Sequence, residues 1–282
     1  MGILTDTFTL SNSTEIPKVG FGTWQVPDGK ATYDAVRTAL DVGYRHIDTA
    51  HGYGNEASVG RAVRDSGIAR EDLFITSKLP ADAKTHDLAA TRRDESLTNL
   101  DLGWIDLYLV HAPWPWDRIA TRHDQGNLDA WRALEEGYGD GTLKAIGISN
   151  FDVHDMENLL AHGDVAPVVN QIQYYVGFTE PVITSFAHDH GMLVEAYSPL
   201  ATGDMLGNAD VAAVAEAHGV SAAQVALRFC LQNGILPLPK AVGPEHIRDN
   251  AELDFELTAD EMTTLNALAD TAPSHYHNPT QG

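Results

Sequence analysis

Short apolar runs alternate along the chain with segments whose apolar residues recur every three or four positions. Short bounded runs are typical of buried β-strands, and the three- and four-residue spacing is typical of amphipathic helices. The helical spacing is clear at Val36 and Ala39 and again at Met156 and Leu159. Strands are expected at residues 19–22, 44–48, 73–77, 105–110, 144–148, 168–172, 192–196 and 235–238.

Eight strands that alternate with helices predict an α/β protein, a closed parallel (β/α)₈ TIM barrel. Such barrels commonly use about 250 residues as one domain. No linker divides this chain, so a single domain is expected over residues 1–282. Alternating apolar positions at 7–10 and 16–19 predict an N-terminal β-hairpin. Long loops at the C-terminal rim are expected after the fourth and seventh strands, at 114–126 and 198–203.

The composition narrows the possible partners. Hydrophobic residues make up 43% of the chain, enough for a buried core. There are 18 Lys and Arg residues against 40 Asp and Glu residues, a formal net charge of −22. An anionic surface repels nucleic acid and anionic lipid, and no apolar run reaches the length of a membrane span. We expect a small-molecule partner, no nucleic-acid or membrane partner, and a monomer or weak dimer.

The single cysteine bears on the cellular compartment. Cys230 has no second cysteine with which to form a disulfide, which fits a reducing cytoplasm. Its apolar helical neighbours predict a small buried side chain rather than a reactive thiol. The N-terminus lacks the cationic and apolar segments of a signal peptide, so a cytoplasmic location is expected.

Four chemically active side chains fall at or just beyond predicted strand ends. Asp48 ends the second strand, Lys78 and His111 come directly after the third and fourth, and Tyr53 lies in the turn after Asp48. Taken singly, each has an ordinary explanation as a turn cap, a packed ring, a solvated cation or a strand-end histidine. The C-terminal strand ends of a barrel meet at one rim, where active sites are built. Together the four residues predict a catalytic site.

The usual nucleotide-binding motifs are missing. No Gly-x-Gly-x-x-Gly follows a strand and no P-loop pattern occurs, so neither a Rossmann domain nor a P-loop is supported. Phosphate binding in a barrel uses loops and helix N-termini near the last two strands. The candidates are the segment from Ser198 to Leu200 and the segment from Lys240 into a helix that Pro244 could start.

At this point the chain resembles the aldo-keto reductase family, and within it the prokaryotic branch that includes 2,5-diketo-D-gluconic acid reductases. The matching motifs occur in order and cover nearly the whole length. They include Val19-Gly-Phe-Gly-Thr-Trp24, Gly43-Tyr-Arg-His-Ile-Asp48, Tyr53-Gly-Asn-Glu56, Lys144-Ala-Ile-Gly-Ile-Ser149-Asn150, Asn170-Gln171, the Lys240 segment and Asp254-Phe-Glu-Leu-Thr258.

The resemblance implies hydride transfer from NADPH or NADH to an aldehyde or ketone, with Tyr53 as the general acid. A free phenol has a pKa of about 10 and is a poor donor at neutral pH. A nearby ammonium on Lys78 favours the phenolate and is expected to lower that pKa, while Asp48 keeps Lys78 charged. His111 can hold the carbonyl oxygen as negative charge develops.

The resemblance also implies a nicotinamide site. Ser149, Asn150 and Gln171 would hold the carboxamide, although loop capping is an alternative role for Ser and Asn. Tyr197 would stack on the ring, or merely pack at the rim. The full set assigned to this half of the cofactor is Thr23, Ser149, Asn150, Gln171, Tyr197, Ser198 and Leu200, the last two as pyrophosphate contacts.

The adenosine half departs from the family pattern. Lys240 is present, but Ala241 replaces a serine and His246 replaces an arginine that bind the 2′-phosphate of NADP. An imidazole offers one donor and is only partly charged at pH 7, so phosphate affinity should fall. Asp249 and Asn250 match the adenine-contacting positions. The sequence therefore predicts relaxed or dual use of NADPH and NADH.

The substrate pocket departs as well. Pro80 and Ala112 stand where relatives tend to carry tryptophan. Trp24 is retained as a pocket residue, and Trp114 and Trp116 are expected to refill part of the space from the loop, with rim packing as the alternative. These replacements predict a wider pocket that accepts bulkier carbonyl compounds.

Metal chemistry is not expected. His188 and His190 lie two residues apart at a helix end, so they do not share a face, and no further ligands complete a shell. His275 and His277 in the turn-rich tail could overhang the pocket.

Two other functions stay open. The barrel could bind a nicotinamide nucleotide as a sensor or structural subunit without catalysis, although the intact Tyr53 and Lys78 argue against it. A hydrolase with paired carboxylates needs two acids opposed across the rim, and only Asp48 is well placed.

Overall fold

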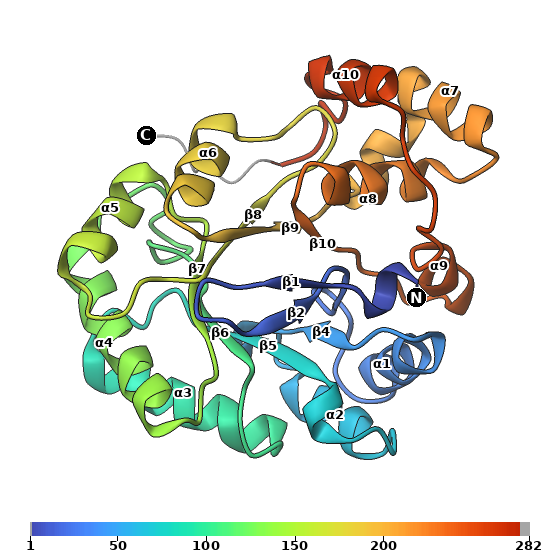
Figure 1. Ribbon diagram of the computed structural model, residues 1–282. Coiled ribbons are helices and arrows are strands. Elements are labelled where there is room, and N and C mark those ends of the chain that lie inside the picture. Colours follow the sequence, from blue (N-terminus) through green and yellow to red (C-terminus); the bar gives the residue numbers. More distant parts are fainter. Residues whose placement is uncertain (1, 277–282) are drawn as a thin grey trace.

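Eight parallel strands form a barrel surrounded by helices in the computed structural model, which describes residues 2–276 (Figure 1). Each strand is hydrogen-bonded to the next along the chain, and Gly22 N–H donates to the Pro239 carbonyl at 2.9 Å where last and first strands meet. All eight predicted strands are confirmed within about two residues. They are β3 (Gly20–Gly22), β4 (His46–Asp48), β5 (Phe74–Leu79), β6 (Leu107–Val110), β7 (Ile146–Ser149), β8 (Val169–Gln173), β9 (Leu193–Tyr197) and β10 (Leu236–Leu238).

The predicted N-terminal hairpin is also confirmed. Strands β1 (Thr7–Thr9) and β2 (Glu15–Pro17) pair antiparallel. Ile16 of β2 is fully buried and belongs to the same apolar cluster as Leu107 and Leu109 of the barrel. The hairpin therefore contributes apolar side chains to the interior of the barrel.

Helices connect the strands and cover the barrel from outside (Figure 1). Two of them begin with a reciprocal capping box, made by Ser221 with Gln224 and by Thr258 with Glu261, which fixes where each helix starts. Cys230 is buried, as predicted. The helices are α1 (Lys30–Val42), α2 (Glu56–Arg64), α3 (His86–Leu100), α4 (Asp124–Asp140), α5 (Val153–His162), α6 (Pro181–Asp189), α7 (Ala209–His218), α8 (Ala222–Gln232), α9 (Pro244–Asp249) and α10 (Ala259–Ala267).

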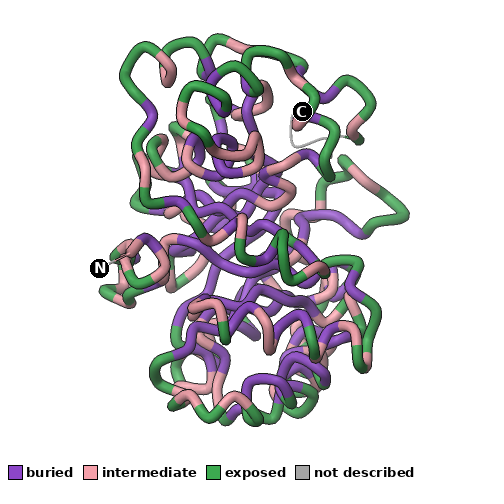
Figure 2. The backbone as a smooth tube through the Cα atoms, turned by 90° about the vertical axis from the view of Figure 1, so that its right-hand side faces the viewer, coloured by how far each residue is buried: buried purple, intermediate pink, exposed green. Residues whose placement is uncertain are grey.

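The pleat of the strands separates two cores. Along β6, Leu107 and Leu109 join the cluster inside the barrel, whereas Tyr108 and Val110 join the cluster under the helices. Successive side chains point to opposite faces of a strand, so both faces are buried here. Figure 2 accordingly shows buried residues concentrated in the middle of the molecule and exposed residues mostly at its periphery.

The two connections that were expected to be long loops differ in secondary structure. After β6, the chain runs irregularly until α4 begins at Asp124, two residues before the expected end of that loop. After β9, part of the connection forms a 3₁₀ segment, η4 (Ala201–Gly207). Pro244 starts α9, as predicted. Within residues 2–276, no helix is long and apolar enough to cross a membrane.

Candidate active site

A buried ion pair occupies the top of the barrel. Lys78 Nζ lies 2.6 and 2.8 Å from the two carboxylate oxygens of Asp48 and donates to the Thr49 carbonyl at 2.8 Å. Lys78 is fully buried and Asp48 is 4% exposed. Burial by itself would lower the pKa of Lys78, but the attraction of Asp48 and Tyr53 outweighs it and the net pKa is raised. Lys78 therefore keeps its proton.

The phenol of Tyr53 approaches this pair from a short 3₁₀ turn, η2 (His51–Tyr53). Its hydroxyl lies 3.4 Å from Lys78 Nζ, and the ring of His111, just beyond β6, lies 5.6 Å from the tyrosine ring, centroid to centroid. The backbone thus brings Asp48, Tyr53, Lys78 and His111 to one point, as the strand-end argument predicts.

Burial changes the expected acidities. Desolvation raises the pKa of Tyr53 more than Lys78 lowers it, so the expected net fall is wrong in direction. A phenolate loses water on entering this site, and a single ammonium that is already paired with Asp48 does not replace it fully. For His111, burial and then the charge of Lys78 hold the pKa well below its usual range, so the imidazole is neutral at pH 7.

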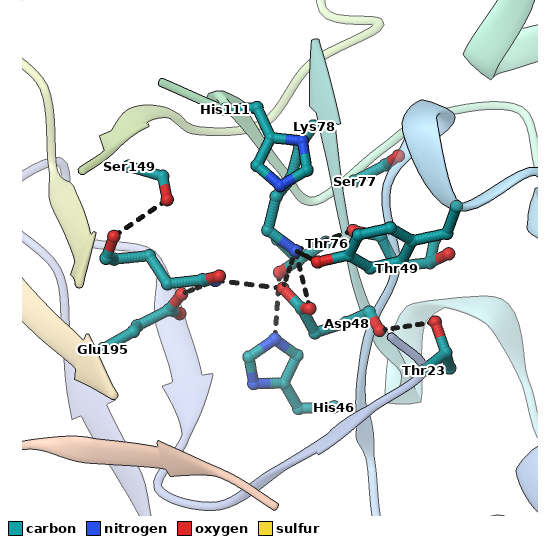
Figure 3. A network of polar contacts seen from close by, with 12 residues as sticks. Thr23, His46, Asp48, Thr49, Thr76, Ser77, Lys78, His111, Ser149 and Glu195 are labelled. Carbon is teal, nitrogen blue, oxygen red and sulfur yellow. Dashed lines mark hydrogen bonds and ion pairs between the residues drawn. The ribbon is translucent and has the colours of Figure 1, made fainter. Parts of the chain in front are cut away.

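A second buried carboxyl group extends the network (Figure 3). Gln171 Nε2 donates to Asp48 Oδ2 at 3.0 Å and to Glu195 Oε2 at 2.8 Å. Glu195 is fully buried on β9. Sequence reasoning missed it, although a lone acid inside the apolar run 192–196 was the available signal, because acidic residues are seldom fully buried without a partner.

The residues expected at the nicotinamide carboxamide are linked to one another. Ser149 Oγ donates to the Gln171 backbone carbonyl at 2.8 Å, and Asn150 Nδ2 donates to the His111 carbonyl at 3.0 Å. Tyr197 O–H donates to Asn150 Oδ1 at 2.7 Å. These bonds tie the ends of β6, β7, β8 and β9 together, which is the structural role that was expected as the alternative for Ser149 and Asn150.

A cavity of about 930 Å³ opens beside this network and runs from the catalytic candidates to the last strand. Its walls include most of the side chains predicted from the sequence, namely Trp24, Asp48, Tyr53, Pro80, His111, Ser149, Asn150, Gln171, Tyr197, Ser198, Leu200, Lys240, His246, Asp249 and Asn250.

Four predicted site residues do not line the cavity, and one of them is Lys78, which is fully buried. The Thr23 side chain is buried and donates to the Asp48 backbone carbonyl at 3.0 Å, so it braces β4 instead. Ala112 and Trp114 are buried in a small apolar cluster with Ala81, and of these three only Ala81 lines the cavity. Both residues follow β6, so the path of this loop, and not the strand, decides whether they reach the cavity.

Trp116 forms the aromatic wall in their place. It is 45% exposed and lines the cavity, with its ring 5.5 Å from His111 and 5.1 Å from Trp114 in edge-to-face contacts. Trp24, 44% exposed, also lines the cavity. Edge-to-face contacts of this kind are favourable for aromatic pairs. The buried Trp114 therefore supports the exposed Trp116 from behind.

The far end of the cavity is more open. Lys240 and His246 are exposed, and Asp249 accepts a hydrogen bond from Ser221 Oγ at 2.7 Å. Ser198 has a positive φ of 49°, a strained backbone conformation for a residue with a side chain. The segment after β9 is thus bent sharply where it borders the cavity.

The histidines set aside as metal ligands form no metal centre within residues 2–276, where no group of three or more potential ligands comes together. His188 is exposed, and the ring of His190 stacks on Phe186 at 4.1 Å. His275 lines the cavity and contacts Thr202 Oγ1 at 3.1 Å, whereas His277 lies outside the described residues.

Comparison with known proteins agrees with this geometry. The aldo/keto reductase family model matches residues 18–270. Glyoxal reductase of Bacillus subtilis is 40% identical over 266 residues, covering 94% of this chain and 93% of the relative. The 9,11-endoperoxide prostaglandin H2 reductase of Trypanosoma cruzi is 37% identical over 266 residues, with 92% and 90% covered.

Solved structures give the same result. An aldo-keto reductase from a Medee basin deep-sea metagenome library superposes with a TM-score of 0.90 at 34% identity, covering 96% of this chain and 98% of its own. An aldo/keto reductase from Brucella melitensis superposes with a TM-score of 0.87 at 36% identity, covering 93% and 98%. The chain belongs to the aldo/keto reductase family and is an oxidoreductase that acts on carbonyl groups.

Proposed function

We propose that the protein reduces aldehydes and ketones to alcohols with NADPH or NADH, using Tyr53 as the proton donor. The observation that carries this proposal is the position of Lys78 Nζ, bonded to the Asp48 carboxylate and 3.4 Å from the Tyr53 hydroxyl at the wall of the cavity. An acid that loses a proton in a buried site needs a cation beside it, and Lys78 supplies that cation.

The polar wall fits a nicotinamide. Gln171 lines the cavity, and its amide nitrogen already donates to Asp48 and Glu195. The side-chain carbonyl oxygen is the hydrogen-bonding group that Gln171 has left for a bound molecule, and it can only accept. A carboxamide N–H is a matching donor. When bound, the nicotinamide supplies the hydride.

The chain's own residues manage the proton and the charge. The raised pKa of Tyr53 keeps the phenol protonated at neutral pH, so it is ready to donate to the carbonyl oxygen. Lys78 then stabilises the phenolate that forms. His111, neutral because burial lowers its pKa, can donate an N–H to the same oxygen without placing another buried cation beside Lys78.

The substrate end suits bulky, weakly polar carbonyl compounds. Pro80 narrows the wall less than a tryptophan would, while Trp24 and Trp116 offer exposed aromatic faces at the cavity. Asp82 also lines this region, and it is exposed. We propose that aryl and other apolar aldehydes and ketones are reduced along with small dicarbonyls.

The cofactor phosphate end supports dual cofactor use. Lys240 lines the cavity and is exposed, so it can approach a 2′-phosphate. Ala241 is 8% exposed and has no hydroxyl, and His246 offers an imidazole, a group that is only partly charged at pH 7. The site therefore keeps one strong phosphate contact instead of three. NADPH should bind somewhat better than NADH, with both turned over.

Tyr53→Phe tests the function. Removing one hydroxyl should lower kcat for carbonyl-dependent NAD(P)H oxidation by about 10²- to 10⁴-fold, because general acid catalysis contributes on that scale. The dissociation constant of NADPH, measured by quenching of protein fluorescence, should stay within about threefold of the unmodified protein, because the hydroxyl is proposed to bond the substrate and not the cofactor.

Measuring NADPH binding and carbonyl-dependent oxidation together also distinguishes a reductase from a barrel that binds the nucleotide without catalysis. A protein that binds NADPH yet oxidises none of it with a panel of aldehydes and ketones would be a nucleotide-binding barrel without catalysis. Unchanged turnover in Tyr53→Phe would remove Tyr53 from the mechanism while leaving the reductase assignment intact.

A further inference from the structure

Glu195 is a buried carboxyl group that the proposed reaction does not use. It shares the side-chain nitrogen of Gln171 with Asp48, at 2.8 and 3.0 Å (Figure 3). Gln171 and Glu195 are register partners on neighbouring strands, so both side chains project into the same layer of the barrel. A single amide nitrogen thus connects the site's ion pair to a second acid.

The two acids are in different electrostatic situations. Asp48 has the ammonium of Lys78 at 2.6 Å, whereas no cation lies within ion-pair distance of Glu195 in the described part of the chain. Glu195 Oε1 is buried and has no hydrogen-bond partner there. Burial, and then the nearby charge of Asp48, raise the pKa of Glu195 to about 8, despite the bond from Gln171 and the charge of Lys78. Glu195 is therefore mostly protonated at pH 7.

The ionisable groups around Glu195 do not change charge in the same range. On β4, His46 has a pKa of about 3 because of burial and Lys78, and Asp48 is paired with that lysine. The pKa of His111 is well below its usual range, while the pKa values of Tyr53 and Lys78 are raised. From β10, Glu195 is paired in register with apolar Leu236. Of the groups named here, Glu195 is the one whose charge changes between pH 7 and 9.

We propose that Glu195 sets the relative affinity of the site for reduced and oxidised nicotinamide, acting through Gln171. This role rests on the proposed function, in which Gln171 faces the carboxamide. The oxidised ring carries a positive charge and the reduced ring is neutral. A protonated Glu195 leaves the reduced form favoured, whereas an ionised Glu195 attracts the oxidised ring. Glu195 touches neither cofactor nor substrate, so it is a positioning residue that also sets the charge.

Such a role explains why an acid is kept in this interior position. A neutral Glu195 accepts the hydrogen bond that orients Gln171 without adding a second anion behind the ring. Because binding and proton loss are linked, the oxidised cofactor must lower the pKa of Glu195 when it binds, and the reduced cofactor must not. Below the pKa the enzyme is poised to bind the reduced cofactor, which is the form that carbonyl reduction consumes.

The test is the ratio of two dissociation constants. The constants for the oxidised and reduced forms of one cofactor are measured by fluorescence quenching from pH 7 to 9, above the titration of a 2′-phosphate near pH 6. In the unmodified protein, oxidised cofactor should gain about five- to tenfold in affinity relative to reduced cofactor across this range. In Glu195→Gln, which retains an acceptor for Gln171 but cannot ionise, the ratio should be constant.

Three further measurements exclude other causes. In Tyr53→Phe, the pH dependence should persist, because the phenol is not its source; its loss would transfer the effect to Tyr53 and overturn the proposal. Titration calorimetry in buffers of different ionisation enthalpy should show that oxidised cofactor releases part of a proton at pH 8. The matched surface variant Glu216→Gln should behave as the unmodified protein does.

The outcomes distinguish this proposal from the one on which it rests. A protein that binds neither cofactor form refutes the proposed function. A protein that binds both, with a ratio that is flat in pH or equally pH-dependent in Glu195→Gln, refutes the role of Glu195 alone. Should Glu195→Gln fail to fold, the unmodified protein still tests the role of Glu195. A ratio of dissociation constants that does not change with pH, or the absence of proton release, would refute that role.

Discussion

The two ends of the cavity differ in how far their basic side chains are buried. At the nicotinamide end, Lys78 is fully buried and holds three oxygen atoms within 2.8 Å. At the adenosine end, Lys240 and His246 are exposed, and no ion pair within the described residues fixes either side chain. Removing one member of a buried network costs much of the free energy of unfolding, whereas each exposed charge contributes little to it. The chemistry should therefore tolerate few substitutions, and cofactor choice should tolerate many.

Removing the buried cation should have the largest effect. Lys78→Met leaves the Asp48 carboxylate buried without its partner, which should cost about 3–5 kcal/mol of unfolding free energy. Urea denaturation followed by circular dichroism measures this loss. The double variant Asp48→Leu with Lys78→Met should recover much of the stability while remaining inactive. A single variant as stable as the unmodified protein would contradict the description of this end as a tightly coupled network.

Restoring the phosphate contacts should have an intermediate effect. Ala241→Ser with His246→Arg adds a hydroxyl and a planar cation to the end of the cavity that Lys240 lines, and should raise the preference for NADPH over NADH by about tenfold to a hundredfold. Stability should be nearly unchanged, because His246 is exposed. The ratio of kcat/KM for the two cofactors measures the effect. A starting preference for NADPH above about a thousandfold would rule out dual cofactor use.

The aromatic wall should show the smallest effect on catalysis. Trp116→Ala removes an exposed ring from the substrate end and should lower kcat/KM for aryl ketones by about three- to tenfold, with little change for small dicarbonyls. Equal losses for both substrate classes would show that Trp116 supports His111 and does not bind the substrate. The matched variant Trp24→Ala tests the second exposed tryptophan of the cavity.

A substitution in the apolar cluster of Ala81, Ala112 and Trp114 tests whether Ala112 serves packing or substrate binding. Ala112 is fully buried beside Trp114, so Ala112→Trp should overpack the cluster and cost about 1–3 kcal/mol of unfolding free energy. Its effect on substrate choice should be secondary to this loss. Thermal denaturation measures the stability, and unchanged stability would indicate that the side chain reaches the cavity after all.

Most of the architecture could be predicted from local sequence patterns. Strand positions follow from short apolar runs, and parallel strands necessarily bring their C-terminal ends to one rim. Asp48, Lys78 and His111 could be grouped from the sequence alone because each lies at or next to the end of a strand. Their approach to one another is a consequence of topology, which alternation of strands and helices already specifies.

Details that depend on the path of loops and on burial could not be read from the chain. Trp114 and Trp116 are alike in sequence, yet one is buried and the other faces the cavity, because the loop after β6 decides their directions. The direction of the Tyr53 pKa shift could not be predicted from the sequence either, since desolvation depends on how closely other segments cover the phenol.

The sequence by itself determined the barrel, its rim and the four side chains gathered there, because these follow from periodicity and strand order. Only the tertiary structure decided that Gln171 joins Asp48 to Glu195, residues that lie far apart along the chain. Hydrogen bonds across a barrel depend on the register and closure of the whole sheet, which no local pattern encodes.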